Sequence, residues 1–289
     1  MKHHYIPEFY TKRWATASDK LICQFALHPE GVSPKRKSPA GVGFEEDLYA
    51  IPGAPQSVSS HLEAHFFRVT DQEGSDALNM LLSGRLNDMT SEQKSGWARF
   101  IMSTLHRNPQ KIRWYGKVWA GMHAEAAENA RREIEENNGD LGQLGDFEHT
   151  FAVSFVRVLQ TIMDSTLIGQ HLINMRWMVI ELHEYKRLLT SDRPLLRTNG
   201  IGNPDAQIGF PLSPSHLFVA ANNDRALQQV ASINAKDLSR QVNHHIVIQA
   251  ERYVYAADDA QQSFVTNRLG KQPSQFLAPP HLLQKYPRD

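Results

Sequence analysis

The chain has few of the features by which protein classes are most readily recognised. It contains one cysteine, Cys23, among 289 residues, so neither an intramolecular disulfide nor a cysteine-rich zinc site can form. Every apolar run is shorter than the roughly 20 residues of a membrane-spanning helix, and the front end lacks the apolar stretch of a signal peptide. These absences predict a cytoplasmic protein that does not enter a membrane.

The sequence also has no excess of positive or negative charge. Lysine and arginine total 31, and aspartate and glutamate also total 31. No global field therefore draws the protein to long nucleic acids or anionic lipid, and any binding of a polyanion has to be local. A Walker loop, a GxSxG elbow, an HExxH helix, a Rossmann glycine pattern and a zinc knuckle are also missing from the sequence. The enzyme classes that carry those motifs are excluded.

The pattern of apolar residues predicts an α+β protein. Residues 1–50 are mostly extended or irregular, with a short strand at 21–27 and an extended piece at 44–51. Helical periodicity begins beyond them, at 57–72, 90–108, 109–139 and 147–174, and returns at 236–249. Short β-rich runs lie between about 176 and 256. We expect a single domain over residues 1–289, predominantly helical, with a small antiparallel sheet in its 176–256 part and an extended N-terminal segment.

Two helix boundaries are well marked. Thr90 and Gln93 form a capping-box pattern, and Pro109 suits the first position of a long helix that ends near Gly139. The segment from about 120–145, which includes the back half of that helix, is nearly all alanine and charge. This composition predicts a charged arm that either projects into solvent or faces a protein partner.

The N-terminal stretch "KHHYIPEFYTKRW" is the first candidate for a functional site. An imidazole can be a metal ligand, a general acid or base, or a donor to phosphate, and His3 and His4 point to opposite sides of an extended segment. At most one of them enters a given pocket. The alternative is that Tyr5 and the apolar and aromatic residues after it only pin the N-terminus to the core.

A group of carboxylates is the second candidate for a functional site. Adjacent acids in "EEDLY", Glu46 and Asp47 among them, offer the oxygen ligands that Mg²⁺ or Mn²⁺ prefers, and Glu63 on the next helix could join them. Taken alone, the triplet is better explained as ordinary acidic surface, and Glu63 could simply complement the dipole of its helix.

Arg107 and Asp192 are the third and fourth candidates. Arg107 lies between two helices in "LHRNP", where its planar guanidinium suits a phosphate or a carboxylate, or else an internal ion pair. Asp192 lies at a bend in "LLTSDRPLL". Its carboxylate either serves as a ligand or base, or stabilises the turn itself as an Asx motif. His244 and His245 lie on a helix at 236–249, and packing is the better interpretation for both.

Seven of these segments, in this order, resemble the DUF4238 family of bacterial proteins. They are "HYIPEFYTKRWA", "GVGFEEDLYAI", "LEAHF", "HRNP", "LLTSDRPLL", "IGFPLSP" and "AERYVYA", and they span nearly the whole chain. The family's His-Tyr-x-Pro stretch falls on His4, Tyr5 and Pro7, which makes His3 the expendable histidine. Its pre-proline arginine falls on Arg107, and its Ser-Asp-x-Pro turn on Ser191, Asp192 and Pro194. The family carries no settled activity, so the resemblance implies no reaction.

These observations lead to one function and two rivals. The leading hypothesis is a metal-dependent hydrolase or nuclease that acts on a nucleotide or short nucleic acid, in a toxin or phage-defence role. His4, Tyr5, Arg107 and Asp192 would be its catalytic residues, and Glu46, Asp47 and Glu63 would hold the divalent metal. The rivals are a non-catalytic module that binds a ligand or partner in a polar pocket, and a structural subunit.

Overall fold

The computed structural model describes residues 2–49, 62–140, 142, 147–182, 187–198, 200–272 and 280–287. The first part of the chain carries four strands and a short helix. They are β1 (Lys2–His4), α1 (Glu8–Thr11), β2 (Ile22–His28), β3 (Gly31–Lys37) and β4 (Phe44–Glu46). A run of helices comes next, with a π-helical turn at Leu62–Phe67 before the first. They are α3 (Arg68–Leu82), α4 (Ser91–His106), α5 (Pro109–Glu136), α6 (Phe147–Met163) and α7 (Thr166–Asn174).

The second half of the chain has five strands in succession, then two helices, one strand and two short helices, among the described residues. Its strands are β5 (Arg176–Glu181), β6 (Thr190–Ser191), β7 (Leu196–Thr198), β8 (Gln207–Ser213), β9 (His216–Ala221) and β10 (Tyr253–Ala256). Its helices are α8 (Asp224–Ala231), α9 (Ala235–Gln249), α10 (Gln262–Thr266) and α11 (Pro280–Lys285). Within the described part of the chain, no helix is long and apolar enough to span a bilayer.

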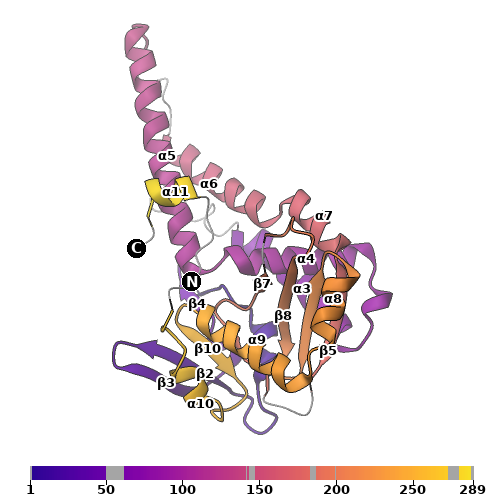
Figure 1. Cartoon of the computed structure of the whole chain (residues 1–289). Helices are drawn as coiled ribbons and strands as arrows, with labels where there is room; N and C mark the ends of the chain where they lie inside the picture. Colours follow the sequence, from indigo (N-terminus) through magenta and orange to yellow (C-terminus); the bar gives the residue numbers. More distant parts are fainter. Residues whose placement is uncertain are drawn as a thin grey trace.

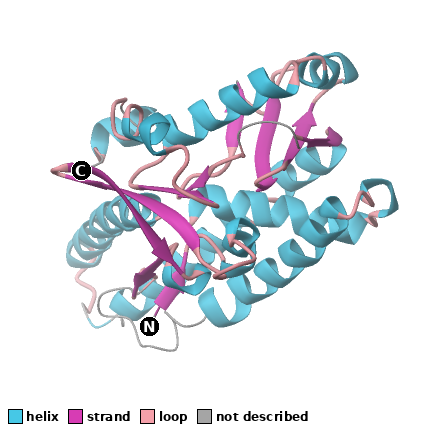
Figure 2. Ribbon diagram, turned by 90° about the horizontal axis from the view of Figure 1, so that it is seen from below, coloured by secondary structure: helices cyan, strands magenta, loops and turns pink. Residues whose placement is uncertain are grey.

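The strands pair into three antiparallel sheets in the part of the chain that the structure describes. β1 pairs with β4, a second sheet has the order β3-β2-β10-β6, and a third has the order β5-β9-β8-β7. Figure 1 shows α9 running between the second and third sheets, and Figure 2 shows the helices and strands of the molecule from below. The second sheet joins the two ends of the chain, because Phe25 of β2 lies opposite Val254 of β10.

The prediction of a predominantly helical chain with one small sheet is wrong, because three sheets form among the described residues. The stretch at 28–43 is rich in proline, glycine and lysine, a composition that predicts a loop. It contains β3, which is the edge strand of its sheet, and proline and lysine are characteristic of edges that have to resist further pairing.

The helix boundaries agree better with expectation. Thr90 and Gln93 form both hydrogen bonds of the capping box at the start of α4. Pro109 is the first residue of α5, whose C-terminal half extends beyond the other described elements in Figure 1. The helix predicted over 147–174 is interrupted near Asp164, whose carboxylate pairs with Arg99 of α4. The start of the helix predicted over 57–72 lies outside the described residues.

Two large apolar cores hold most of these elements together, and a third, small cluster joins Trp114 and Val118 of α5 to Tyr286. The first places Trp97 and Phe100 of α4 against Phe210 and Phe218 of the third sheet, with their rings in edge-to-face contact. The second lies beneath α9, where Ile246 packs among side chains of both four-stranded sheets. These cores fix the junction of α4 and α5 against the bend between β6 and β7, which is where the candidate site lies.

Candidate functional site

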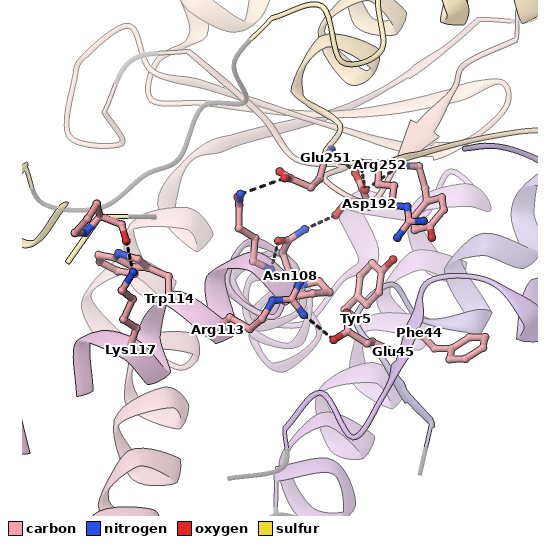
Figure 3. Close-up of a pocket in the computed structure, with 14 residues that line it drawn as sticks. Tyr5, Phe44, Glu45, Asn108, Arg113, Trp114, Lys117, Asp192, Glu251 and Arg252 are labelled. Carbon is pink, nitrogen blue, oxygen red and sulfur yellow. Dashed lines mark hydrogen bonds and ion pairs between the residues drawn. The ribbon is translucent and has the colours of Figure 1, made fainter. Parts of the chain in front are cut away.

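A cavity of about 530 Å³ opens at the junction of α5 with the second sheet (Figure 3). Its walls come from the N-terminal segment, the start of α5, the β6–β7 bend, the loop between α9 and β10, and the C-terminal segment. The lining residues are Tyr5, Phe44, Glu45, Asn108, Pro109, Gln110, Arg113, Trp114, Lys117, Asp192, Glu251, Arg252, Tyr253 and Pro287. Segments far apart in the sequence therefore meet at one place.

Asp192 fixes one wall of this cavity. Its carboxylate accepts three backbone hydrogen bonds, from the N–H of Glu251 at 2.9 Å, of Arg252 at 2.7 Å and of Tyr253 at 2.9 Å. Burial raises the pKa of Asp192 to about 6, although the three N–H donors favour the charged form. Because its oxygens are committed to the backbone, the main task of Asp192 is to hold the loop between α9 and β10 in place.

A polar network joins that loop to the start of α5. The side-chain amide of Gln110 donates to Glu251 at 3.1 Å, and the guanidinium of Arg193 pairs with Glu251 at 2.5 Å and also donates to Gln110. Asn108 caps α5 by accepting the backbone N–H of Gln110 at 3.0 Å. The network thus fixes the relative position of the two walls that carry the charged lining residues.

Three cations line the cavity, and they differ in their partners. Arg113 forms a 2.6 Å ion pair with Glu45 of β4, and the side chains of both residues are exposed. Lys117 donates to the backbone carbonyl of Pro287 at 3.0 Å. Arg252 forms no ion pair with any carboxylate that the structure describes, and its guanidinium lies 5.3 Å from the ring centre of Tyr253. Arg252 is therefore the lining cation most available to an anionic ligand.

Aromatic side chains supply the apolar part of the lining. Tyr5 is buried, and its backbone N–H donates to the carbonyl of Gly43 at 2.8 Å. Burial, with a smaller effect of the Asp192 carboxyl, raises the pKa of Tyr5 well above its usual range. Gly43 has a positive φ of 66°, and a Cβ there would come within 2.7 Å of the carbonyl oxygen of Ile6. Glycine is thus required for the close approach that brings Tyr5 to the cavity.

His4 and Arg107 do not line the cavity, although their sequence neighbours Tyr5 and Asn108 do. Successive side chains of an extended segment point to opposite faces, so His4 and Tyr5 separate. Arg107 is fully buried and pairs with Asp71 of α3 at 2.8 Å. Burial lowers the pKa of His4, and the charges of Asp71 and Arg107 also act on it. Of the four predicted catalytic residues, Tyr5 and Asp192 thus line the cavity, whereas the half-buried His4 and the buried Arg107 do not.

Further residues of the N-terminal stretch anchor it. His3 is buried, stacks on Tyr49 at 5.0 Å between ring centres, and accepts the backbone N–H of Tyr49 at 3.3 Å. The hydroxyl of Tyr10 bonds to Thr190 at 2.7 Å, and the indole of Trp14 donates to the carbonyl of Leu188 at 2.8 Å. The stretch therefore both pins the N-terminus and contributes one side chain to the cavity.

The residues predicted to bind a metal, Glu46, Asp47 and Glu63, are not among the lining residues of the cavity. Glu46 ends β4 and is exposed, and Asp47 comes directly after it with a positive φ of 51°. Glu63 lies in the π-helical turn before α3, and its side chain lies outside the described residues. Among the side chains that the structure describes, no three from His, Cys, Asp or Glu gather closely enough to hold a metal ion.

Sequence reasoning missed the charged residues of the cavity. Arg113 and Lys117 are four residues apart on α5, a spacing that places two cations on one helix face, and this signal could have been noticed. Glu251 and Arg252 lie directly after α9 in the segment "AERYVYA". Nothing local distinguishes them from ordinary surface, because their role depends on Asp192, about sixty residues earlier in the chain.

Comparison with known proteins identifies the family of the chain but gives no information about a reaction. The family model described as "Protein of unknown function (DUF4238)" matches residues 2–260 of the 289. The chain belongs to this DUF4238 family. The cavity lies almost wholly within the matched segment, since among its lining residues only Pro287 falls outside it. No curated protein and no solved structure matches the chain.

Proposed function

We propose that this DUF4238 protein binds a nucleotide, or the end of a short single strand of nucleic acid, in the cavity of Figure 3. The observation that carries the proposal is Arg252, a cation without a described carboxylate partner that lies over the ring of Tyr253 at the wall of an aromatic-lined cavity. A guanidinium suits a phosphate, and aromatic faces suit a nucleobase, so one site offers both contacts.

The size and charge of the cavity support the same class of ligand. Its volume of about 530 Å³ is in the range of small-molecule sites. Arg113 and Glu45 form an exposed ion pair, and such pairs contribute only about 0 to 1 kcal/mol to stability. A phosphate can therefore replace Glu45 as the partner of Arg113 at little cost in free energy. This exchange adds a second cation to the site and leaves the carboxylate of Glu45 unpaired beside the ligand.

That exchange suggests how hydrolysis would proceed. Asp192 is poorly suited to act as the base, because its oxygens accept three backbone N–H groups. Glu45, once released from Arg113, is the carboxylate that could activate water. Mg²⁺ or Mn²⁺ needs only one or two protein carboxylates when phosphate oxygens and waters complete its shell, so Glu45 could hold such an ion instead. We propose nucleotide or phosphodiester hydrolysis on this basis, and a toxin or phage-defence role would depend on it.

Binding and turnover are tested separately. Isothermal titration of the full chain with nucleoside mono- and triphosphates, with and without Mn²⁺, should give saturable heats. Arg252→Gln should weaken binding about tenfold, the effect of losing roughly 1.4 kcal/mol. The matched control is Arg225→Gln on α8, an exposed arginine that does not line the cavity, which should leave binding unchanged. Absence of saturable binding by the wild type would end the proposal.

Turnover distinguishes an enzyme from a binding module. Released phosphate and shortened oligonucleotides are measured with the same ligands and Mn²⁺. Glu45→Gln should keep binding and lose turnover if Glu45 acts as base or metal ligand. Binding without turnover in the wild type would favour the non-catalytic module instead.

A further inference from the structure

A second concave surface shares no lining residue with the nucleotide cavity. It is a groove of about 320 Å³ between α9 and the edge of the third sheet. Leu238 and Val242 line it from α9, and Ile208 and Val219 line it from β8 and β9. The two α9 residues are four positions apart, so they lie on one face of the helix and present an apolar wall to the groove.

Arg197 of β7 is the arginine among the lining residues of this groove. No carboxylate in the described chain forms an ion pair with Arg197, and no described group accepts a hydrogen bond from its guanidinium. Arg197 is an exposed residue, although partial burial of its guanidinium lowers the pKa of that group. An accessible arginine without a described protein partner can pair with an anion from outside the chain.

The surroundings of Arg197 strengthen this argument. Lys111 of α5 is only 6% exposed, and no described residue forms an ion pair or a hydrogen bond with its amine. The charges that act on Lys111 most strongly are the cations of Arg197 and Arg193. Nearby His106 bonds through Nδ1 to the hydroxyl of Tyr115 at 2.7 Å and adds no negative charge. Near Arg197, Lys111 thus adds an amine without a described ion-pair partner, whereas the charge of Arg193 is balanced by Glu251.

We propose that the groove binds an amphipathic carboxylate of the fatty-acid class, with its carboxylate on Arg197 and its hydrocarbon chain between α9 and the third sheet. Charge complementarity selects the head group, since Arg197 offers a planar pair of donors that matches a carboxylate. The apolar walls select the tail, because each CH₂ that they remove from water strengthens binding.

The test uses the full-length protein and decanoate below its micelle concentration, measured by isothermal titration. Decanoate should bind saturably, and affinity should fall about fourfold for each CH₂ removed along the series to octanoate and hexanoate. Decanol, which has the tail without the charge, should bind more weakly than decanoate. Arg197→Gln should reduce decanoate affinity about tenfold, whereas Arg225→Gln should leave it unchanged.

Three results would overturn the proposal. They are absence of decanoate binding, equal affinity across the chain-length series, and equal affinity in the Arg197→Gln variant when circular dichroism shows that it is folded. The same variant also separates this groove from the nucleotide cavity, because Arg197 does not line that cavity. Arg197→Gln should bind nucleotide like the wild type, and an equal loss of both ligands would overturn the assignment of a separate site.

Discussion

The backbone N–H of Arg252 donates a 2.7 Å hydrogen bond to the buried carboxylate of Asp192. This contact connects the β6–β7 bend to the loop that carries the cavity's cation without a described ion-pair partner. It explains why an aspartate suits this bend: the carboxylate has enough lone pairs for three backbone donors at once, and Asn or Ser does not. The position of Arg252, and with it the proposed phosphate contact, depends on Asp192.

Substitution of Asp192 should therefore destabilise the protein and also weaken nucleotide binding. Asp192→Ala leaves three backbone N–H groups without their acceptor, and we expect a loss of about 3 kcal/mol in the free energy of unfolding. Asp192→Asn keeps one acceptor oxygen and should lose less. Urea denaturation measures both. The control is Asp258→Asn, whose half-exposed carboxylate accepts a single backbone N–H, from Ala260, and which should change stability by about 0.5 kcal/mol or less.

The buried pair of Arg107 and Asp71 should behave as one unit. Asp71→Asn leaves the guanidinium of Arg107 without its counter-charge beneath Phe67 and Phe100, and we expect a loss of about 2 to 3 kcal/mol, reduced from the fully buried case because Asp71 is a quarter exposed. Arg107→Met combined with Asp71→Asn should lose less than the sum of the single variants. Additive losses in a double-mutant cycle would show that the pair is not coupled.

The C-terminal helix α11 should detach when a methyl group is placed at Gly121. A Cβ at Gly121 would lie 2.2 Å from the ring of Tyr286, whereas a Cβ at Gly116, earlier on α5, would have 3.9 Å to its nearest neighbour, Phe155. Gly121→Ala should make the C-terminus more susceptible to carboxypeptidase, as measured by mass spectrometry. Gly116→Ala, the matched control, should leave cleavage unchanged and stabilise α5 by up to about 1 kcal/mol. Equal cleavage rates in both variants would contradict this packing.

The buried amine of Lys111 should make the free energy of unfolding rise with pH. Burial, with smaller effects of the charges of Arg197 and Arg193, lowers its pKa to about 7, below its ordinary value of 10.5. Above pH 7 the unfolded chain keeps a proton that the folded chain releases, so this residue makes stability rise with pH from about 7 towards 10. The slope approaches about 1.4 kcal/mol per pH unit. Lys111→Met should remove this rise and be more stable than the wild type at pH 7, as urea denaturation at pH 7 and about 8.5 would show. If the free energy of unfolding changed with pH equally in the wild type and in Lys111→Met, this prediction would be wrong.

The helices were predictable because their signals are local. Thr90 and Gln93 are three residues apart, and Pro109 begins α5 where its missing N–H and fixed φ are tolerated. The sheets were not predictable in the same way. In the edge strand β3, Pro34 and Lys35 obscure its hairpin with β2, and β2 in turn pairs with β10 from the far end of the chain. The pairing with β10 leaves no mark on the local pattern.

The candidate site was likewise only partly predictable from the sequence. The turn motif around Asp192 was recognised, but its partners could not be, since the backbone amides of residues 251–253 have no sequence signature. Tyr5 and His4 were predicted together, and only the pairing of β1 with β4 decides which of them reaches the cavity. The cations Arg113 and Arg252 become a site through the packing of α5 against the second sheet, which depends on the whole fold.

The most direct test of the central claim observes the cavity wall while a nucleotide is added. Trp114 lines the cavity, and its indole N–H donates to the carbonyl of Tyr286 at 2.8 Å, whereas Trp177 lies on β5 and bonds to Leu172. In ¹H–¹⁵N spectra of the full chain, with the indole signals assigned from Trp114→Phe and Trp177→Phe, a titrated nucleoside monophosphate should shift the Trp114 signal saturably and leave that of Trp177 unmoved. An unmoved Trp114 signal at saturating nucleotide, or equal shifts of both signals, would contradict nucleotide binding in this cavity.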